Sequence, residues 1–281
     1  MSQNVKCLKD NLFYPLYMYY LCFGDWGENT HLKKQISDLV KALKPDAVLS
    51  LGDNFYDTGV LSAYDSKWKD FTNYFHLPFY AILGNHDHLG NILAQIKYKE
   101  NGWIMPARFY THMVENTQLI ALDTFELAPL ESLHNSISMG MSATECHKRI
   151  DYLKTENQYE WLERTLQTST AKWKIVFGHY PIYSNGPHGD TDQLKIYLLP
   201  LLKKYGVHLY LAGHDHSICH KEDGVHCIVS GCGSRQSQTN RVPGYTNLPS
   251  TGIAYIKTSN VLEFGFHDLN GNIMMQRILT T

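Results

Sequence analysis

Short apolar runs alternate with amphipathic stretches along most of this 281-residue chain. In the first part of the chain, the pattern predicts strands at residues 17–23, 47–50 and 79–83. Between the first two runs, residues 31–43 carry apolar side chains at helical spacing, with Asn29 or Thr30 available as the cap. This succession of strands and connecting helices predicts a parallel sheet.

The rest of the chain also contains predicted strands and helices, in a different order. Further strands are predicted at residues 118–122, 173–177, 208–212, 225–229, 252–257 and 261–266, the last three antiparallel. Further helices are predicted at residues 157–167 and 192–205, the second kinked at Pro200. The pattern therefore predicts an α/β fold of two mixed β-sheets packed face to face with flanking helices.

Five short motifs follow predicted strands, and each begins with glycine and then offers a potential metal ligand. They are GDWG (24–27), GDNFY (52–56), GNHD (84–87), GHYP (178–181) and GHDH (213–216). Glycine permits a sharp turn and a close approach of the backbone to a ligand. Ligand sites in open α/β sheets lie beyond the carboxyl ends of the strands, so we expect one shared site. A single Gly-Asp is common turn chemistry, but five such motifs favour a dinuclear metallohydrolase.

The chemistry of the motifs narrows the choice of metal. Carboxylates, an amide and imidazoles without a thiolate suit iron, manganese or zinc. Asp53, in the second motif, is the natural bridging carboxylate. Tyr56 can bind a metal as phenolate only where a strong Lewis acid removes its proton, and Fe(III) is the best candidate. We expect Asp87 to support its turn and Asp215 to point away from the metals.

This motif set resembles the purple acid phosphatases, specifically the small tartrate-resistant type of animals, within the calcineurin-like metallophosphoesterase superfamily. The resemblance covers most of the chain from about residue 20 to the end. It implies a metallophosphoesterase domain over residues 17–281, after an N-terminal extension over residues 1–16. It also implies seven metal ligands, which are Asp25, Asp53, Tyr56, Asn85, His179, His214 and His216.

By the same resemblance, Fe(III) is held by Asp25, Asp53, Tyr56 and His216. The divalent ion, which is Fe(II), zinc or manganese, is held by Asp53, Asn85, His179 and His214. The implied function is an acid phosphatase, in which a metal-bound hydroxide attacks small phosphate monoesters or phosphorylated peptides.

Two further histidines match family residues that contact the phosphate and help the leaving group to depart. These are His86 and His188. The animal members of the family usually carry an acidic residue directly before the second histidine, where this chain has Pro187. Protonation of the leaving group by that acidic residue is therefore excluded here.

Two other functions stay open. One is a phosphodiesterase or protein phosphatase of the calcineurin-like group, whose sites usually place a histidine where this chain has Gly27. The other is a catalytically silent scaffold, as among the parasite glideosome proteins that resemble purple phosphatases. Scaffolds generally lose ligands, whereas this chain retains all seven positions, which favours the enzyme.

Charge and cysteine content bear on partners and compartment. The formal net charge of −2 gives no electrostatic case for nucleic acid or an anionic membrane, and we expect a monomer. Among six cysteines, Cys219 and Cys227 flank a predicted turn and could face each other across a hairpin. Residues 12–23 lack a signal-peptide cleavage site, and no Asn-x-Ser/Thr acceptor occurs. These features favour an intracellular location over the secreted or lysosomal habit of the family.

Overall fold

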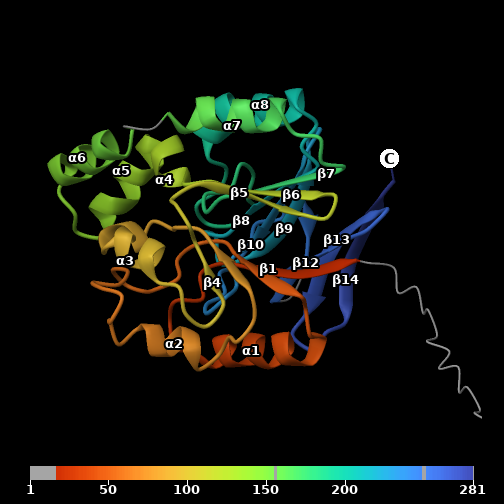
Figure 1. Cartoon of the computed structure of the whole chain (residues 1–281), viewed down its shortest axis with the longest axis horizontal. Coiled ribbons are helices and arrows are strands. Elements are labelled where there is room, and N and C mark those ends of the chain that lie inside the picture. Colours follow the sequence, from red (N-terminus) through yellow and green to blue (C-terminus); the bar gives the residue numbers. More distant parts are fainter. Residues whose placement is uncertain (1–16, 155–156, 249–250, 281) are drawn as a thin grey trace, which may run out of the picture.

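Two seven-stranded sheets packed face to face form the centre of the computed structural model (Figure 1), which describes residues 17–154, 157–248 and 251–280. The strand order is β14-β13-β12-β1-β2-β3-β4 in the first sheet and β11-β9-β10-β8-β7-β6-β5 in the second. Strands β1 to β4 run parallel to one another, as do β6, β7, β8 and β10, and the outer strands are antiparallel. The predicted α/β fold of two mixed sheets is confirmed.

The strands of the first sheet are β1 (Met18–Phe23), β2 (Ala47–Ser50), β3 (Phe79–Ala81), β4 (Trp103–Ile104), β12 (Gly252–Thr258), β13 (Leu262–Asp268) and β14 (Ile273–Leu279). Those of the second sheet are β5 (Tyr110–Val114), β6 (Thr117–Ala121), β7 (Trp173–Phe177), β8 (Leu209–Ala212), β9 (Ile218–Glu222), β10 (His226–Ser230) and β11 (Thr246–Asn247). Every strand that the sequence predicts is present, with shifts of one or two residues at most ends. The strand expected to be antiparallel at residues 225–229 is β10, which is antiparallel to β9 but parallel to β8.

Helices cover both outer faces and one end of the sheets. They are α1 (His31–Leu43), α2 (Trp68–Thr72), α3 (Ile92–Lys97), α4 (Thr124–Leu127), α5 (Pro129–Ser138), α6 (Ala143–Leu153), α7 (Gln158–Gln167) and α8 (Leu199–Lys204). In Figure 1, α1 and α2 lie on one side of the sheets, α7 and α8 lie on the opposite side, and α3 to α6 gather at one end. No helix within the described residues combines the length and apolar character needed to cross a bilayer.

Local chemistry explains where the first helix begins and how the helix near Pro200 is distorted. Thr30 rather than Asn29 caps α1, because its hydroxyl accepts a hydrogen bond from the Lys33 amide. The helix expected over residues 192–205 is present as a continuous helical stretch over residues 192–204, in which Leu194–Leu198 has π-helical hydrogen bonding and leads directly into α8. Pro200 follows the π-helical stretch directly and has no amide hydrogen to donate to the preceding turn.

A cluster of aromatic rings, packed between the first sheet and helices α1 and α2, fixes the first two motifs. The Trp26 ring is fully buried and lies 5.4–5.7 Å, between ring centroids, from those of Phe55, Phe75 and Phe79. Such aromatic pairs contribute about 0.5–1.5 kcal/mol each beyond the area they bury. The Trp26 Nε1–H donates to Ser50 Oγ at 2.7 Å. This ring packing and this hydrogen bond therefore hold the GDWG and GDNFY turns together.

Cys219 and Cys227, which the sequence allowed to face each other, do not stand opposite each other. In the β9–β10 hairpin, Cys219 stands opposite Val229 and Cys227 stands opposite Lys221, so the two thiols are out of register. Both are free and buried. The residues expected to form an N-terminal extension, 1–16, lie outside the described residues.

Candidate metal centre

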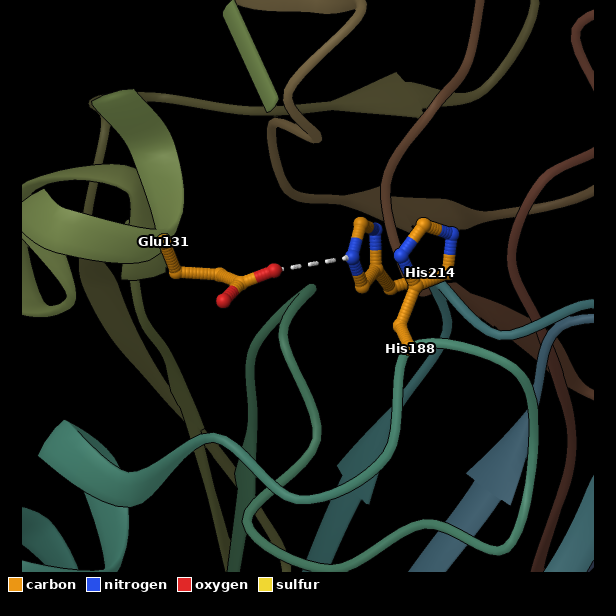
Figure 2. A group of neighbouring side chains, drawn as sticks. All are labelled: Glu131, His188 and His214. Atoms are coloured by element: carbon orange, nitrogen blue, oxygen red, sulfur yellow. Dashed lines mark ion pairs between the residues drawn. The ribbon is translucent and has the colours of Figure 1, made fainter. Parts of the chain in front are cut away.

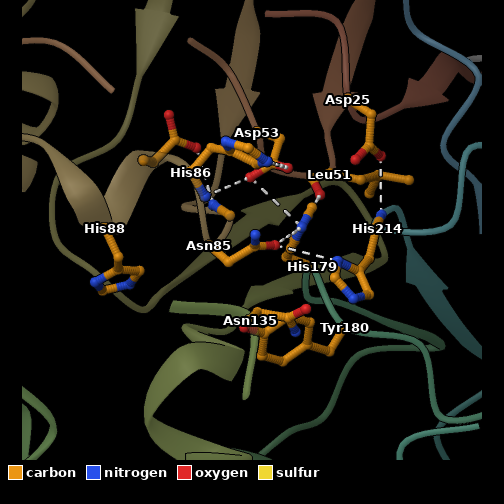
Figure 3. A network of polar contacts seen from close by, with 12 residues as sticks. Asp25, Leu51, Asp53, Asn85, His86, His88, Asn135, His179, Tyr180 and His214 are labelled. Carbon is orange, nitrogen blue, oxygen red and sulfur yellow. Dashed lines mark hydrogen bonds and ion pairs between the residues drawn. The ribbon is translucent and has the colours of Figure 1, made fainter. Parts of the chain in front are cut away.

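The five motifs meet at the seam between the two sheets. The first sheet supplies Asp25 after β1, Asp53 after β2 and Asn85 after β3. The second sheet supplies His179 after β7, followed by His214 and His216 after β8. Figure 3 shows side chains from both sheets converging on one small volume. The carboxyl ends of the parallel strands thus form the site, as expected for this class of sheet.

The backbone at these turns is held in an unfavourable conformation. Asp25, Asp53 and His214 have φ values of 61°, 52° and 69°, in the left-handed region that non-glycine residues rarely adopt. Each such residue costs on the order of 1–3 kcal/mol. The glycines permit the close packing, because a Cβ on Gly84 would lie 2.1 Å from Asp53 Oδ1 and one on Gly213 would lie 2.5 Å from Asp25 Oδ2. Strain at three potential ligands indicates a functional constraint.

Three of the side chains form a first cluster. The Tyr56 hydroxyl donates to Asp25 Oδ1 at 3.2 Å and lies 3.1 Å from His216 Nε2. His216 Nε2 is 3.6 Å from the same carboxylate oxygen. Burial and the neighbouring carboxylates Asp25 and Asp53 raise the pKa of Tyr56 well above its usual value. A phenolate at this position therefore requires a strong cation.

A second cluster lies beside the first and is formed by Asn85, His179 and His214. The Asn85 Oδ1 atom is 2.9 Å from His179 Nε2 and 3.1 Å from His214 Nδ1. The other ring nitrogen of His179, Nδ1, is 2.8 Å from the carbonyl oxygen of Leu51 and donates to it. Burial lowers the pKa of His179, which favours the neutral ring with a single N–H. The Nε2 lone pair therefore faces an oxygen lone pair, an arrangement that a metal cation resolves.

Asp53 lies between the two clusters. Its Oδ1 atom is 3.5 Å from His179 Nε2 and accepts a hydrogen bond from the His86 amide at 3.0 Å. Asp25, Asp53 and His179 each offer a ligand atom, and these atoms lie within 4.8 Å of one another. Burial, followed by the charge of Asp53, raises the pKa of Asp25 well above its usual range. The donor set and this accumulation of buried negative charge fit a pair of metal ions.

The two histidines expected to contact substrate each lie beside one of these clusters. The His86 ring is partly exposed, packs against the Tyr56 ring at 4.4 Å between centroids, and contacts the Asp57 carbonyl through Nδ1 at 2.5 Å. The His188 ring is exposed and lies 4.2 Å from the His214 ring between centroids. Both rings are thus placed beside a cluster of potential ligands.

The two acidic residues next to potential ligands support the turns. The buried Asp87 side chain accepts hydrogen bonds from the amides of Gly84 and Asn54, at 2.9 and 3.0 Å, and from Gln95 Nε2 at 2.8 Å. Burial, with a further contribution from the charge of Asp53, raises the pKa of Asp87 to about 6. Asp87 joins the GNHD turn to the GDNFY turn, as the sequence led us to expect.

The carboxylate of Asp215 points away from the clusters and has a specific task. It accepts hydrogen bonds from the hydroxyl of Ser184 and, at 2.9 Å, from the amide of His188. Asp215 therefore anchors the loop that carries His188.

Two side chains at the site were not anticipated from the sequence. The Arg235 guanidinium lies over the Tyr56 ring, 5.2 Å from its centroid, and pairs with Glu28. Glu131, from α5, lies with one carboxylate oxygen 3.6 Å from His214 Nε2. Neither residue belongs to a glycine motif, so no local signal in the sequence marks it.

Comparison with known proteins agrees with this geometry. Residues 18–217 match the family model described as calcineurin-like phosphoesterase. The chain is 33% identical to tartrate-resistant acid phosphatase type 5 of Homo sapiens, over 86% of this chain and 84% of the relative. It is 33% identical to purple acid phosphatase 3 of Arabidopsis thaliana, over 77% of this chain and 63% of the relative.

Two solved structures share the fold. The first is GAP50, described as the anchor in the inner membrane complex of Plasmodium, with a TM-score of 0.73 and 25% identity over 94% of this chain and 89% of that chain. The second is the purple acid phosphatase PPD1 from yellow lupin seeds, with a TM-score of 0.70 and 16% identity over 94% of this chain and 54% of that chain. The lupin structure supports the fold alone, whereas the sequence relatives bear on the family.

Proposed function

The chain belongs to the calcineurin-like phosphoesterase family and, within it, to the purple acid phosphatases, enzymes of the acid phosphatase type, and we propose that it hydrolyses phosphate monoesters at a dinuclear Fe(III)–M(II) centre. The observation that carries the proposal is the convergence of all seven expected ligands. In particular, the lone pairs of His179 Nε2 and Asn85 Oδ1 face each other at 2.9 Å in the interior of the protein.

Each cluster fits one of the two ions. The first, Asp25, Tyr56 and His216, offers the phenol that selects Fe(III). The second, Asn85, His179 and His214, offers one amide oxygen and two imidazoles to a divalent ion. Asp53 lies between them and is shared. When bound, the two cations supply the positive charge that binds phosphate and lowers the pKa of water, so that a nucleophile exists at acidic pH.

The side chains at the rim then act on substrate. His86 and His188 flank the clusters, where their N–H groups can bind phosphate oxygens and give a proton to the departing alkoxide oxygen. The His86 Nδ1–H is held by the Asp57 carbonyl, which leaves Nε2 directed to the site. Arg235, over the Tyr56 ring, adds a positive charge on the same side.

The geometry disfavours the phosphodiesterase or protein phosphatase alternative. A Cβ at Gly27 would lie 2.6 Å from the Tyr56 amide nitrogen and 2.7 Å from that of Phe55. A histidine at this position therefore has no room, and Tyr56 occupies its place in the ligand set.

The scaffold alternative draws on the likeness to GAP50, which is described as an anchor. This chain, however, retains all seven ligand positions, and three of them have strained backbone conformations. A protein that needs only the fold has no use for this strain. The balance favours catalysis.

The direct test is hydrolysis of a chromogenic phosphate monoester at acidic pH by the wild-type protein and the Asp53→Asn variant. Because Asp53 is shared by both ions, we expect the variant to lose activity by about 1,000-fold or more. Asp38→Asn, at an exposed position of α1, is the matched control and should retain full activity. A wild-type protein that stays inactive after reconstitution with iron, zinc and manganese would favour the scaffold.

A further inference from the structure

We propose that Glu131 is a positioning residue for the divalent-metal site, because its carboxylate accepts the Nε2–H of His214 when His214 Nδ1 binds the ion. The inference rests on the proposed dinuclear centre. Figure 2 shows the group, with Glu131 reaching from α5 toward the His214 and His188 rings.

The orientation of the His214 ring separates its two nitrogens. Nδ1 lies 3.1 Å from Asn85 Oδ1, on the side where the second cluster converges. Nε2 lies on the opposite edge of the ring, is buried, and has no hydrogen-bond partner among the residues that the structure describes. If Nδ1 gives its lone pair to the metal, the neutral ring carries its hydrogen on Nε2. That hydrogen requires an acceptor.

Glu131 provides this acceptor. Its Oε1 atom is 3.6 Å from His214 Nε2, an ion-pair separation that a small rotation of a partly exposed side chain shortens to a hydrogen bond. Glu131 does not bind the same ion directly, because one imidazole cannot direct both nitrogens to one ion. The carboxylate therefore acts through His214.

His179 shows the corresponding arrangement with a different acceptor. Its Nδ1–H donates to the Leu51 carbonyl at 2.8 Å, which directs Nε2 to the site. Histidine ligands in proteins usually donate their other N–H to a carboxylate or a carbonyl, which fixes the ring and raises its basicity. With Glu131 in place, both imidazoles of the second cluster satisfy this rule.

Helix α5 is anchored so that Glu131 stays beside the ring. Its Ser132 hydroxyl donates to the Phe125 carbonyl at 2.7 Å, and the Leu130 amide donates to Gln193 Oε1 at 2.8 Å. Glu131 Oε1 itself accepts from Asn135 Nδ2 at 2.8 Å, one turn later in the helix. The carboxylate is thus held by its own helix before any metal binds.

The test measures zinc affinity of the iron-loaded protein by competition with a chromophoric chelator, in Glu131→Ala and Glu131→Gln. Loss of such an outer partner typically weakens metal binding by about 10–100-fold, which we expect for Glu131→Ala. Glutamine keeps an acceptor oxygen at this position, so Glu131→Gln should remain within about threefold of wild type, at the lower end of the cost of a neutral hydrogen bond. His134→Ala, at an exposed position of the same helix, is the matched control and should bind zinc normally.

Three results would overturn the proposal. Zinc affinity in Glu131→Ala equal to wild type would show that the carboxylate is not needed. An equal loss in both Glu131 variants would show that charge rather than hydrogen-bond acceptance matters. Loss of the ferric ion in Glu131→Ala would also contradict the proposal, because His214 belongs to the divalent cluster alone. Urea unfolding of the metal-free variants checks that they are folded. A wild-type protein that binds no second ion would instead contradict the proposed function.

Discussion

At the scale of single residues, this protein keeps several polar groups buried at a cost to stability. Asp25 and Asp53 are buried together at the candidate metal centre, where metal ions would offset their charge. Lys33 is a second buried polar group, and it is not one of the candidate metal ligands. Its ammonium group is buried without a hydrogen-bond partner in the described part of the chain, between the rings of Trp26 and Tyr74, at 5.1 and 5.0 Å from their centroids.

Replacement of Lys33 by methionine should therefore stabilise the fold. Burial lowers the pKa of Lys33 from 10.5 to about 8, so the unfolded chain binds its proton more tightly than the folded protein. At neutral pH the folded wild type bears the energetic cost of burying the charged ammonium group. Its stability therefore rises as pH increases from about 8 to 10.5. We expect Lys33→Met to raise the free energy of unfolding by about 1–3 kcal/mol at neutral pH. The upper end corresponds to the full pKa shift of Lys33, and the lower end allows for the lost cation–π contacts.

The measurement is urea unfolding at neutral and alkaline pH. The difference between Lys33→Met and wild type should shrink as pH rises. Lys34→Met, at the neighbouring exposed position, should change stability little at either pH. A Lys33→Met protein less stable than wild type at neutral pH would mean that the two aromatic contacts outweigh the burial penalty.

At the scale of elements, the loop over residues 184–190 carries His188 and depends on Asp215. In Asp215→Asn, a single acceptor oxygen replaces two, so it cannot accept both the Ser184 hydroxyl hydrogen and the His188 amide hydrogen, and one of the two donors loses its acceptor. We expect kcat/KM for a phosphate monoester to fall roughly 10–100-fold, because the rim histidine is no longer held in place. Metal content should remain at the wild-type level, and elemental analysis of the purified variant checks this. Loss of metal together with activity would instead place Asp215 in direct support of the ligands.

The β9–β10 hairpin contains a pair of histidines that should make the fold sensitive to acid. His220 Nε2 and His226 Nδ1 are 3.0 Å apart, so at most one of the rings can be protonated without repulsion. Burial, and then the neighbouring His226, lower the pKa of His220 from 6.5 to about 4. The unfolded chain therefore takes up the proton first, and stability is lost as pH falls from about 6.5 toward 4.

Substitution of His220 by glutamine should reduce this loss. Urea unfolding at about pH 7.5 and pH 5 measures it, since the proton uptake that separates the two states lies between these values. The fall in stability between the two conditions should be smaller in His220→Gln than in wild type, whereas His147→Gln, at an exposed site on α6, should behave as wild type. An unchanged fall in His220→Gln would exclude this pair as the source of acid sensitivity.

Prediction from sequence succeeded where a local pattern carries the information. Strands such as β2 and β7 are short apolar runs bounded by turn residues, and the ligand motifs follow them directly. Helices α2 to α6 were not predicted. α6 begins with a capping box formed by Ser142 and Glu145, a signal that was available in the sequence. Glu131 could not be assigned, because only the docking of α5 brings it to His214.

At the scale of the whole molecule, the candidate centre joins the two sheets. The first sheet provides the aspartates and Asn85, and the second provides the three histidines that follow β7 and β8. Neither sheet alone offers a complete set of ligands for either ion. A complete set of ligands therefore requires the two sheets to be packed so that the carboxyl ends of their parallel strands meet. The apolar core that contains residues of both sheets supports this packing.

The central claim is that the site at the carboxyl ends of these strands holds an Fe(III)–M(II) pair in which Tyr56 binds iron. Its most direct test is the visible absorption spectrum of the iron-loaded protein, recorded together with hydrolysis of a chromogenic phosphate monoester at acidic pH. We expect a violet phenolate-to-iron band in the wild-type protein that disappears in Tyr56→Phe, with turnover in the wild type. A colourless but active protein would contradict the iron–phenolate assignment, and a colourless, inactive protein after reconstitution with iron, zinc and manganese would contradict the enzyme itself.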